Sequence, residues 1–252
     1  MRQVIKLGGR VQQSGAVHEA IARAWRAAPG SLCIVHGGGD EVSRLQRAFG
    51  IEPKFVGGRR VTSPDELDLV RMALSGSANK RLVAALQAAG APAAGLSGED
   101  GRLLVARQAA GGELGRVGEP VVINRAVLTA LYDGGFLPVI SPLGCAEDGS
   151  GALNVNGDDA AAAIAAELGA DELLLLADVD GVMADGAVIP MLDADGAATL
   201  IAAGTAAGGM AAKLDAALRA LEAGVPRVRI GGVGALADSS SGTALMPARS
   251  LV

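Results

Sequence analysis

Short apolar runs rich in β-branched residues alternate with longer amphipathic stretches along this chain. The amphipathic stretches have helical spacing, and several of them end at a glycine, as helices commonly do. Strands that alternate with helices indicate βαβ crossovers, so the sequence predicts an α/β fold with a mostly parallel central sheet. The predicted strands lie at 4–7, 32–36, 121–123, 136–141, 172–179 and 225–230, and the predicted helices at 16–28, 40–48, 64–75, 78–89, 125–133, 158–168 and 210–223.

The core must be built from aliphatic side chains, because aromatic residues make up only 2% of a chain that is 50% hydrophobic. Such a core favours close packing of helices on a sheet. The 37 glycines have no collagen-like period, and we expect them in tight turns and where the backbone approaches a ligand. A chain of 252 residues is long enough for one large domain or two lobes, and we expect a lobe boundary near residue 170.

Charge and cysteine content exclude several classes of protein. The net charge is −5, and no basic cluster is interleaved with aromatic residues, so nucleic-acid binding has no support. Cys33 and Cys145 have no ligand-spaced partners, which favours reduced thiols in a cytosolic protein over disulfides or structural zinc. No apolar run has the length of a signal peptide or membrane span, so we expect a cytoplasmic protein that contacts no membrane.

Two glycine-containing loops follow predicted strands, at the sheet edge where open α/β folds bind ligands. In KLGGR (6–10), Lys6 can extend its ammonium over that edge, while Gly8 and Gly9 let an anion approach the backbone. In VHGGGDE (35–41), three glycines before a helix can form an anion-binding nest. The alternatives are an edge-strand lysine beside an ordinary turn and a purely structural turn.

A polar loop and a later helix add further charged groups. NVNGDD (154–159) offers two asparagine amides, and Asp158 or Asp159 opens the alanine-rich helix that follows. Helix capping alone would explain one such acid. In the helix at 210–223, Lys213 falls near the apolar side, which indicates a ligand-directed lysine; snorkelling along the apolar surface is the alternative.

Several common catalytic motifs are missing. The sequence has no GxxxxGK[ST] phosphate loop and no HRD or DFG motif of protein kinases. An HGGG oxyanion hole would need a GxSxG elbow and a downstream histidine, but the only histidines are His18 and His36. Lysines and backbone amides without a nucleophile or metal cluster favour phosphoryl transfer, where catalysis is mostly positioning and charge stabilisation.

Nine short stretches, in order, resemble the amino acid kinase family and, within it, the members that act on N-acetyl-L-glutamate. The resemblance implies a three-layer αβα sandwich that transfers the γ-phosphate of ATP to the substrate's side-chain carboxylate, forming an acyl phosphate in arginine biosynthesis. It also implies an N-terminal lobe (1–170) for the acyl-amino-acid substrate and a C-terminal lobe (171–252) for ATP. The stretches are IKLGG (5–9), VHGGG (35–39), VGGRRVTS (56–63), SANKRLVAAL (77–86), GLSGEDG (95–101), GFLPVISPLG (135–144), NVNGDDAAAAIA (154–165), LADVDGV (176–182) and GGMAAKLDAA (208–217).

The resemblance further implies roles for individual residues. Lys6 and Lys213 would stabilise the phosphoryl group in transfer, and Asp158 would hold both lysines. The substrate carboxylate is already ionised at neutral pH, so no general base is needed, and Mg²⁺ is expected on the ATP phosphates. The substrate site would use Gly38, Gly39, Arg60 and Asn154, and the ATP site would use Gly8, Gly9, Asp178, Val179, Asp180, Gly181, Val182, Met183, Thr205, Ala206, Ala207, Gly209 and Met210.

Three features depart from the family pattern. Arg59 stands where members more often have leucine, which points to altered substrate selectivity. The stretch at 229–247 is shorter and richer in glycine than usual, which affects the nucleotide-side loops. The chain starts at the first strand, without the N-terminal helix that interlocks arginine-inhibited relatives into hexamers, so we expect a homodimer that arginine does not inhibit.

Two other functions stay open at this point. GLSGEDGRL and SANKRLV also resemble the kinases of lysine biosynthesis that act on carrier-protein-linked aminoadipate. VHGGG, GRRVT and NVNGDDAA favour acetylglutamate instead. A non-catalytic sensor of the same fold is the second alternative, although a sensor would not need Lys6, Asp158 and Lys213 together.

Overall fold

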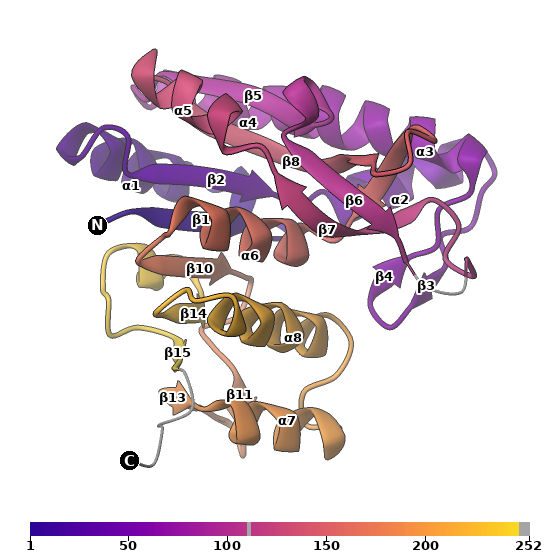
Figure 1. Cartoon of the computed structure of the whole chain (residues 1–252). Coiled ribbons are helices and arrows are strands. Elements are labelled where there is room, and N and C mark those ends of the chain that lie inside the picture. Colours follow the sequence, from indigo (N-terminus) through magenta and orange to yellow (C-terminus); the bar gives the residue numbers. More distant parts are fainter. Residues whose placement is uncertain (110–111, 247–252) are drawn as a thin grey trace.

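One eleven-stranded sheet runs through the protein in the computed structural model, which describes residues 1–109 and 112–246 (Figure 1). β5 (Ala93–Gly98) lies beside β8, off the main path of the sheet. Along that path, from one edge to the other, the strands are β13 (Met191–Leu192), β15 (Thr243–Leu245), β14 (Val228–Gly231), β10 (Glu172–Leu176), β1 (Gln3–Leu7), β2 (Leu32–His36), β8 (Leu137–Ala146), β6 (Leu104–Gln108), β7 (Val117–Ile123) and β9 (Ala152–Val155).

The centre of the sheet is parallel, as the sequence predicted. β10, β1, β2 and β8 run in the same direction, with Lys6 opposite Leu175 on one side and Val35 on the other. β2 and β10 are buried along their whole length, which explains their unbroken apolar runs. β1, β2 and β10 are parallel and in register, so the loops that follow these three strands begin at the same edge of the sheet.

Helices cover both faces of the sheet, which confirms the predicted three-layer αβα sandwich (Figure 1). Val4 and Val35 pack in one core cluster with residues of α6 and α8, whereas Ile5 and Ile34 pack on the other face with α1 and α4. The helices are α1 (Gly15–Ala27), α2 (Gly39–Ala48), α3 (Pro64–Arg71), α4 (Asn79–Ala88), α5 (Arg125–Asp133), α6 (Gly157–Leu168), α7 (Ala194–Ala202) and α8 (Gly209–Glu222), with the short 3₁₀ turns η1 (Val11–Gln13), η3 (Asp100–Arg102) and η4 (Val233–Leu236).

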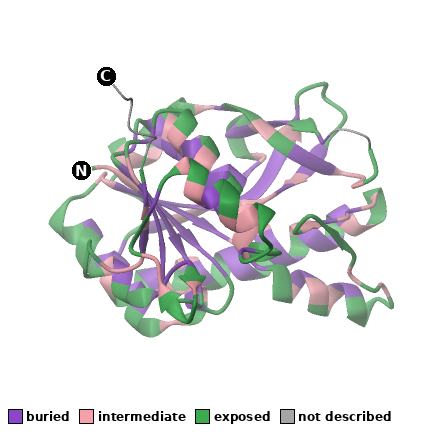
Figure 2. Ribbon diagram, turned by 90° about the horizontal axis from the view of Figure 1, so that it is seen from below, coloured by how far each residue is buried: buried purple, intermediate pink, exposed green. Residues whose placement is uncertain are grey.

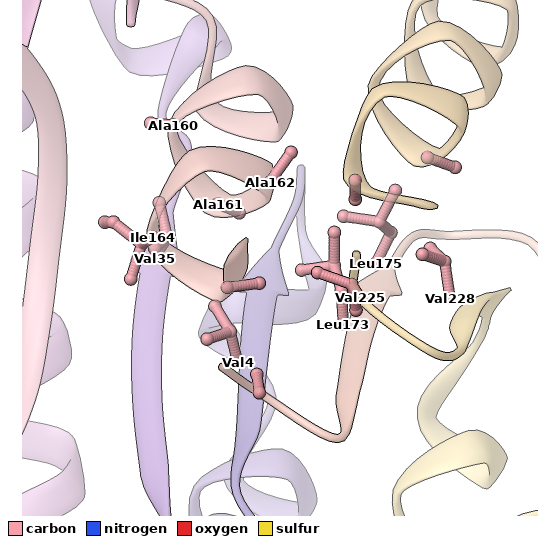
Figure 3. Close-up of a cluster of buried hydrophobic side chains, with 14 of the residues drawn as sticks. Val4, Val35, Ala160, Ala161, Ala162, Ile164, Leu173, Leu175, Val225 and Val228 are labelled. Carbon is pink, nitrogen blue, oxygen red and sulfur yellow. The ribbon is translucent and has the colours of Figure 1, made fainter. Parts of the chain in front are cut away.

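Small side chains let α6 lie close to the sheet. Ala160, Ala161 and Ala165 are fully buried, and Figure 3 shows the alanine-rich face of α6 beside Val4 and Val35. Buried residues concentrate in the sheet and on the inward sides of the helices (Figure 2). This close packing holds the first turn of α6 against the edge where the loops after β1 and β2 begin.

The structure corrects several predicted boundaries. The helices expected at 64–75 and 78–89 are joined, because α3 continues through a π-helical segment, η2 (Met72–Ala78), directly into α4. The strand expected at 136–141 extends further, to Ala146, and β9 follows it at Ala152–Val155. β5, β6 and α7 were not predicted; β5 has the sequence AAGLSG, which lacks the β-branched residues that usually mark a strand. Two small hairpins, β3 (Phe55–Val56) with β4 (Arg59–Arg60) and β11 (Met183–Ala184) with β12 (Ala187–Val188), lie outside the main sheet.

The strands that follow residue 171 form one end of the sheet. β10 pairs directly with β1, so the two halves of the chain share one continuous sheet rather than forming separate domains. Across residues 1–109 and 112–246, no helix combines the length and the apolar character needed to cross a membrane.

Candidate active site

Lys6 lies near the end of β1 and is only 7% exposed. Its Nζ is 2.9 Å from Oδ1 of Asp158. A Cβ on Gly157 would lie 3.2 Å from Cε of Lys6, and one on Gly8 would lie 3.5 Å from Nζ. Glycine at position 157 therefore leaves room for the lysine side chain, whereas the contact with Nζ at position 8 would be an ordinary one.

Asp158 stands in the first turn of α6. The Oδ1 atom of Asn156 accepts hydrogen bonds from the amides of Asp158 (2.8 Å) and Asp159 (3.4 Å), and so caps the helix. A carboxylate is also favoured here by the positive end of the helix dipole. Helix capping alone did not distinguish Asp158 from Asp159, but the family resemblance implied Asp158, and the structure places both lysines against Asp158.

Lys213 reaches the same carboxylate from α8. Its Nζ lies 3.0 Å from Oδ2 and 3.2 Å from Oδ1 of Asp158, and its side chain is 14% exposed. Leu214 and Ala217 are fully buried in the core, which orients the first turns of α8 so that Lys213 points toward α6. Lys6 and Lys213 thus converge on Asp158 from a strand and a helix; we call these three residues the lysine clamp.

The charges of the lysine clamp alter one another's pKa. Burial alone would raise the pKa of Asp158, but the attraction of Lys6 and Lys213 outweighs it and holds that pKa at about 2. Burial and the repulsion of Lys6 lower the pKa of Lys213 to about 8, against the attraction of Asp158. At neutral pH two ammonium groups therefore share one carboxylate, and the excess positive charge favours an anionic ligand.

The glycine loops differ in whether their amides already have a hydrogen-bond acceptor. Gly8 was predicted in the ATP site, but its amide donates to the carbonyl of Leu176 (3.0 Å) and is not free to bind a phosphate. The cause is that the parallel pairing of β1 with β10 continues one residue beyond the strand. The amides of Gly38 and Gly39 have no acceptor among the residues that the structure describes. These two remain available to a ligand.

Gly9 lies where the loop after β1 meets the loop after β10. Its φ is +47°, and a Cβ there would lie 2.6 Å from Oδ2 of Asp178, so only glycine fits without strain. The same oxygen accepts from the amide of Arg10 at 3.4 Å. Asp178 thus ties the loop after β10 to the loop after β1.

The turn after β2 is held by two residues that the sequence analysis did not assign to the site. The imidazole of His36 is fully buried, with Nδ1 2.8 Å from the carbonyl of Gly37 and Nε2 3.1 Å from Nδ2 of Asn79. Burial lowers the pKa of His36 to about 4, so the ring is neutral, with Nδ1 donating and Nε2 accepting. SANKRLVAAL contains Asn79, but nothing in that motif indicated a bond to VHGGG.

A pocket of about 180 Å³ opens beside the lysine clamp. Val42, Leu74 and Val117 supply apolar walls, and Asn154, held by a hydrogen bond from its Nδ2 to Oγ1 of Thr62 (3.0 Å), supplies a polar one. The lining thus combines the predicted substrate residues with part of the lysine clamp. The predicted site residues in the lining are Lys6, Gly38, Gly39, Arg60, Asn154 and Asp158.

Arg60 adds a buried positive charge to this pocket, which Lys6 and Arg59 also line. It is 8% exposed; Nη2 donates to the carbonyl of Gly39 (2.7 Å) and to Oγ of Ser43 (2.8 Å), and Nη1 donates to Gln46. The Phe55 ring lies 4.6 Å from the guanidinium carbon. Burial lowers the pKa of Arg60, and within the described part of the chain no carboxylate forms an ion pair with it. A buried guanidinium in that situation favours a carboxylate ligand.

The residues expected at the nucleotide lie in two loops of the C-terminal half, and they divide into two groups. Val182 and Ala206 are 1% and 4% exposed and belong to the core cluster, so they shape the loops from beneath. A Cβ on Gly181 would lie 2.8 Å from Oγ1 of Thr243, and Met210 also packs against the core. The exposed members are Asp178, Val179, Asp180, Met183, Thr205, Ala207 and Gly209.

No group of three or more His, Cys, Asp or Glu side chains with metal-binding geometry occurs in residues 1–109 and 112–246. Asp158 is already paired with two lysines, and Asp178 accepts a hydrogen bond from the backbone amide of Arg10. The donor set therefore does not form a protein cage for a divalent ion.

A parallel α/β sheet with a lysine clamp and glycine loops at its carboxyl edge defines a class of proteins that bind phosphorylated ligands. Comparison with known proteins agrees with this class. The family model described as "Amino acid kinase family" matches residues 1–232. This chain belongs to the amino acid kinase family.

Individual relatives are similar over nearly the whole chain. The acetylglutamate kinase of Rubrobacter xylanophilus is 43% identical over 246 residues, which is 95% of each protein. That of Solibacter usitatus is 46% identical over 235 residues, covering 91% of this chain and 90% of the relative. Among solved structures, the smu.665 protein of Streptococcus mutans superposes with a TM-score of 0.88 at 32% identity, covering 97% of this chain and 98% of that one.

Proposed function

We propose that this protein is an acetylglutamate kinase, which transfers the γ-phosphate of ATP to the side-chain carboxylate of N-acetyl-L-glutamate in arginine biosynthesis. The observation that carries the proposal is the lysine clamp beside a pocket that contains Arg60, a buried arginine with no ion-pair partner among the described residues. The names of relatives at 40% identity or more over most of the chain support the same activity.

The reaction needs positioning rather than acid–base chemistry. An oxygen of the substrate carboxylate, ionised at neutral pH, attacks the γ-phosphorus; a new O–P bond forms and the bond to ADP breaks. Lys6 and Lys213 lie on either side of Asp158 and stabilise the negative charge that spreads over the phosphoryl oxygens. Asp158 holds both ammonium groups in place and keeps their mutual repulsion from separating them.

The pocket orients the acyl substrate. Arg60 binds the substrate carboxylate that does not react, since its guanidinium is buried and has a fork of donors suited to a carboxylate. Asn154 binds the acetylamino group, and the amides of Gly38 and Gly39 donate to the reacting carboxylate or to the phosphate. Each of these groups lines the same pocket as Lys6.

ATP binds on the other side of the lysine clamp, in our proposal. The exposed part of the loops at 178–183 and 205–210 forms its surface, residues 1–170 serve the acyl substrate and residues 171–252 the nucleotide. Mg²⁺, bound through the ATP phosphates, supplies charge neutralisation when present. We also propose a homodimer, which light scattering would detect as a particle of twice the chain mass, whereas a single-chain mass would contradict it.

A coupled assay of ADP release tests the substrate assignment. We expect turnover with N-acetyl-L-glutamate and little with glutamate, because glutamate lacks the acetylamino group that Asn154 binds. Turnover only with carrier-protein-linked aminoadipate would overturn the choice of substrate. No ADP release with any acyl amino acid would instead favour a non-catalytic protein of this family.

A further inference from the structure

The two acids at the start of α6 each bind a pair of basic side chains. Asp158 binds Lys6 and Lys213, as described above. Asp159 is 6% exposed; its Oδ2 lies 3.1 Å from Nη2 of Arg59, and its Oδ1 accepts from Arg219. Lys213 and Arg219 are on the same helix, α8, so consecutive acids of α6 hold α8 at two points.

Arg59 links this second cluster to the acyl-substrate pocket. It neighbours Arg60 in β4, and successive side chains of a strand point to opposite sides. Both arginines line the pocket, but their partners differ: Arg60 donates to Gly39 and Ser43 of α2, whereas Arg59 bonds Asp159 of α6 and, at 2.6 Å, Oε1 of Glu119. Any shift of Arg59 along or away from Asp159 therefore moves Arg60 as well.

The turn of the same hairpin also touches α8. A Cβ on Gly58 would lie 3.4 Å from the Cβ of Ala212 and 3.4 Å from the carbonyl oxygen of Gly208. The hairpin β3–β4 is thus in contact with the N-terminus of the helix that carries Lys213. This contact does not involve the arginines. The hairpin β3–β4 therefore meets α8 in two ways, directly at Gly58 and through Asp159.

The negative charge of Asp159 holds Arg59 and Arg219 together. Without its charge, Arg59 and Arg219 would face each other as like charges, with only Glu119, which is half exposed, nearby. Burial raises the pKa of Asp159 although both arginines oppose that effect. An amide at this position would keep the shape of the side chain but not the attraction between hairpin and helix.

We propose that Asp159 is a positioning residue that, through Arg59 and Arg219, couples the acyl-substrate hairpin to α8. Binding of the acyl amino acid to Arg60 then favours the arrangement in which Lys213 is ready for the nucleotide, and binding of the nucleotide favours the hairpin position in which Arg60 holds the substrate. This inference rests on the proposed function, since it needs one ligand on each side of the lysine clamp. It assigns to Arg59 a role in coupling rather than in substrate selectivity.

Calorimetric titration measures the coupling directly. The affinity for N-acetyl-L-glutamate is determined with and without a non-hydrolysable ATP analogue, and the ratio is the coupling factor. We expect the analogue to tighten binding in the wild type by about fivefold or more, the lower end of usual coupling between sites. We expect Asp159→Asn to reduce that factor to near 1, and Arg219→Gln, whose side chain is half exposed and whose loss leaves the core intact, to reduce it as well.

A matched control is Arg23→Ala, which breaks the exposed pair of Arg23 with Glu19 on α1, a helix that packs on the opposite face of the sheet from α6 and α8. It should keep the wild-type coupling factor. An unchanged factor in both Asp159→Asn and Arg219→Gln, or a wild-type factor of 1, would overturn the coupling role. If wild-type enzyme releases ADP with acetylglutamate in that case, the proposed function stands and only the coupling fails.

Discussion

Replacing Asp158 with asparagine removes the negative charge from the lysine clamp but keeps the shape of the side chain. Asparagine still offers an oxygen to one of the lysines, which lie 2.9 Å and 3.0 Å from the carboxylate in the wild type. It cannot offset the repulsion between the two ammonium groups. We therefore expect Lys6 and Lys213 to move apart in the free enzyme and the pKa of Lys213 to fall further below about 8.

The size of the effect follows from these distances. Two unit charges 3.0 Å apart interact by about 5 kcal/mol at an effective dielectric constant of about 20. Removing one partner of a buried pair typically costs about 3–5 kcal/mol. Bound phosphates restore part of this interaction, so we expect kcat to fall by about 100-fold, equivalent to about 3 kcal/mol, while the KM for ATP does not rise.

The assay is the pH profile of kcat/KM for ATP, which reports the ionisation of the free enzyme. In the wild type this value should fall as pH rises through about 8, because Lys213 loses its proton. The fall should begin at lower pH in Asp158→Asn. A kcat within threefold of the wild-type value, or an alkaline limb at an unchanged pH, would refute the reasoning.

Three further predictions concern other parts of the site and the fold. Arg60→Ala should raise the KM for N-acetyl-L-glutamate by about 10- to 100-fold with a smaller effect on the KM for ATP, since a charge-assisted hydrogen bond contributes about 1.5–3 kcal/mol; equal changes in both KM values would argue against a carboxylate site. Gly9→Ala should lower the melting temperature and weaken ATP binding, because its φ is +47° and its Cβ would lie 2.6 Å from Oδ2 of Asp178; a variant as stable as wild type would show that the loop adjusts freely. Arg229→Met should reduce the free energy of unfolding by about 3 kcal/mol in urea titration, because it leaves buried Glu172 without its bidentate partner; a loss within the error of the titration would contradict that account.

Stability should increase with pH in two separate ranges, one acidic and one alkaline. The folded-state pKa of Asp158 lies below its ordinary 3.8, so its contribution to stability is complete above that pH and is lost as pH falls toward about 2. The folded-state pKa of Lys213 lies below its ordinary 10.5, so its contribution rises as pH rises from about 8 toward 10.5. Activity and the contribution of Lys213 to stability should therefore diverge above pH 8.

The sequence predicted the fold best where local pattern and burial agree. The run LCIVH is β2 with the predicted bounds, and α5 spans Arg125–Asp133 as expected, because each is punctuated by turn residues and packs in a single way. β5 was missed since its AAGLSG sequence has no strand signal of its own; pairing with β8 imposes the extended backbone. The break expected after residue 75 was wrong because a π-helical segment carries the helix through Gly76.

The site was predictable to the extent that residue type limits chemistry. Helical spacing predicted that Lys213 lies near the apolar side of its helix, and the structure shows its side chain paired with Asp158. Spacing could not tell Asp158 from Asp159, since both lie in the first turn and only tertiary partners separate them. Nor could it show that Arg59 meets Arg219 at Asp159, because those residues are brought together only by the packing of α6 on α8 and the hairpin β3–β4.

The most direct test measures ADP release and, after trapping with hydroxylamine, the acyl phosphate formed as hydroxamate. Both amounts are determined for the wild type and for Lys213→Ala. The account predicts equal amounts of ADP and hydroxamate from N-acetyl-L-glutamate in the wild type. It predicts a rate at least about 100-fold lower in the variant. The fold should survive, because Asp158 keeps Lys6 as its ion-pair partner and the fully buried Leu214 and Ala217 still anchor α8. A wild-type enzyme that forms no hydroxamate, or a Lys213→Ala variant with undiminished turnover, would contradict the central claim that two lysines held by Asp158 carry the phosphoryl transfer.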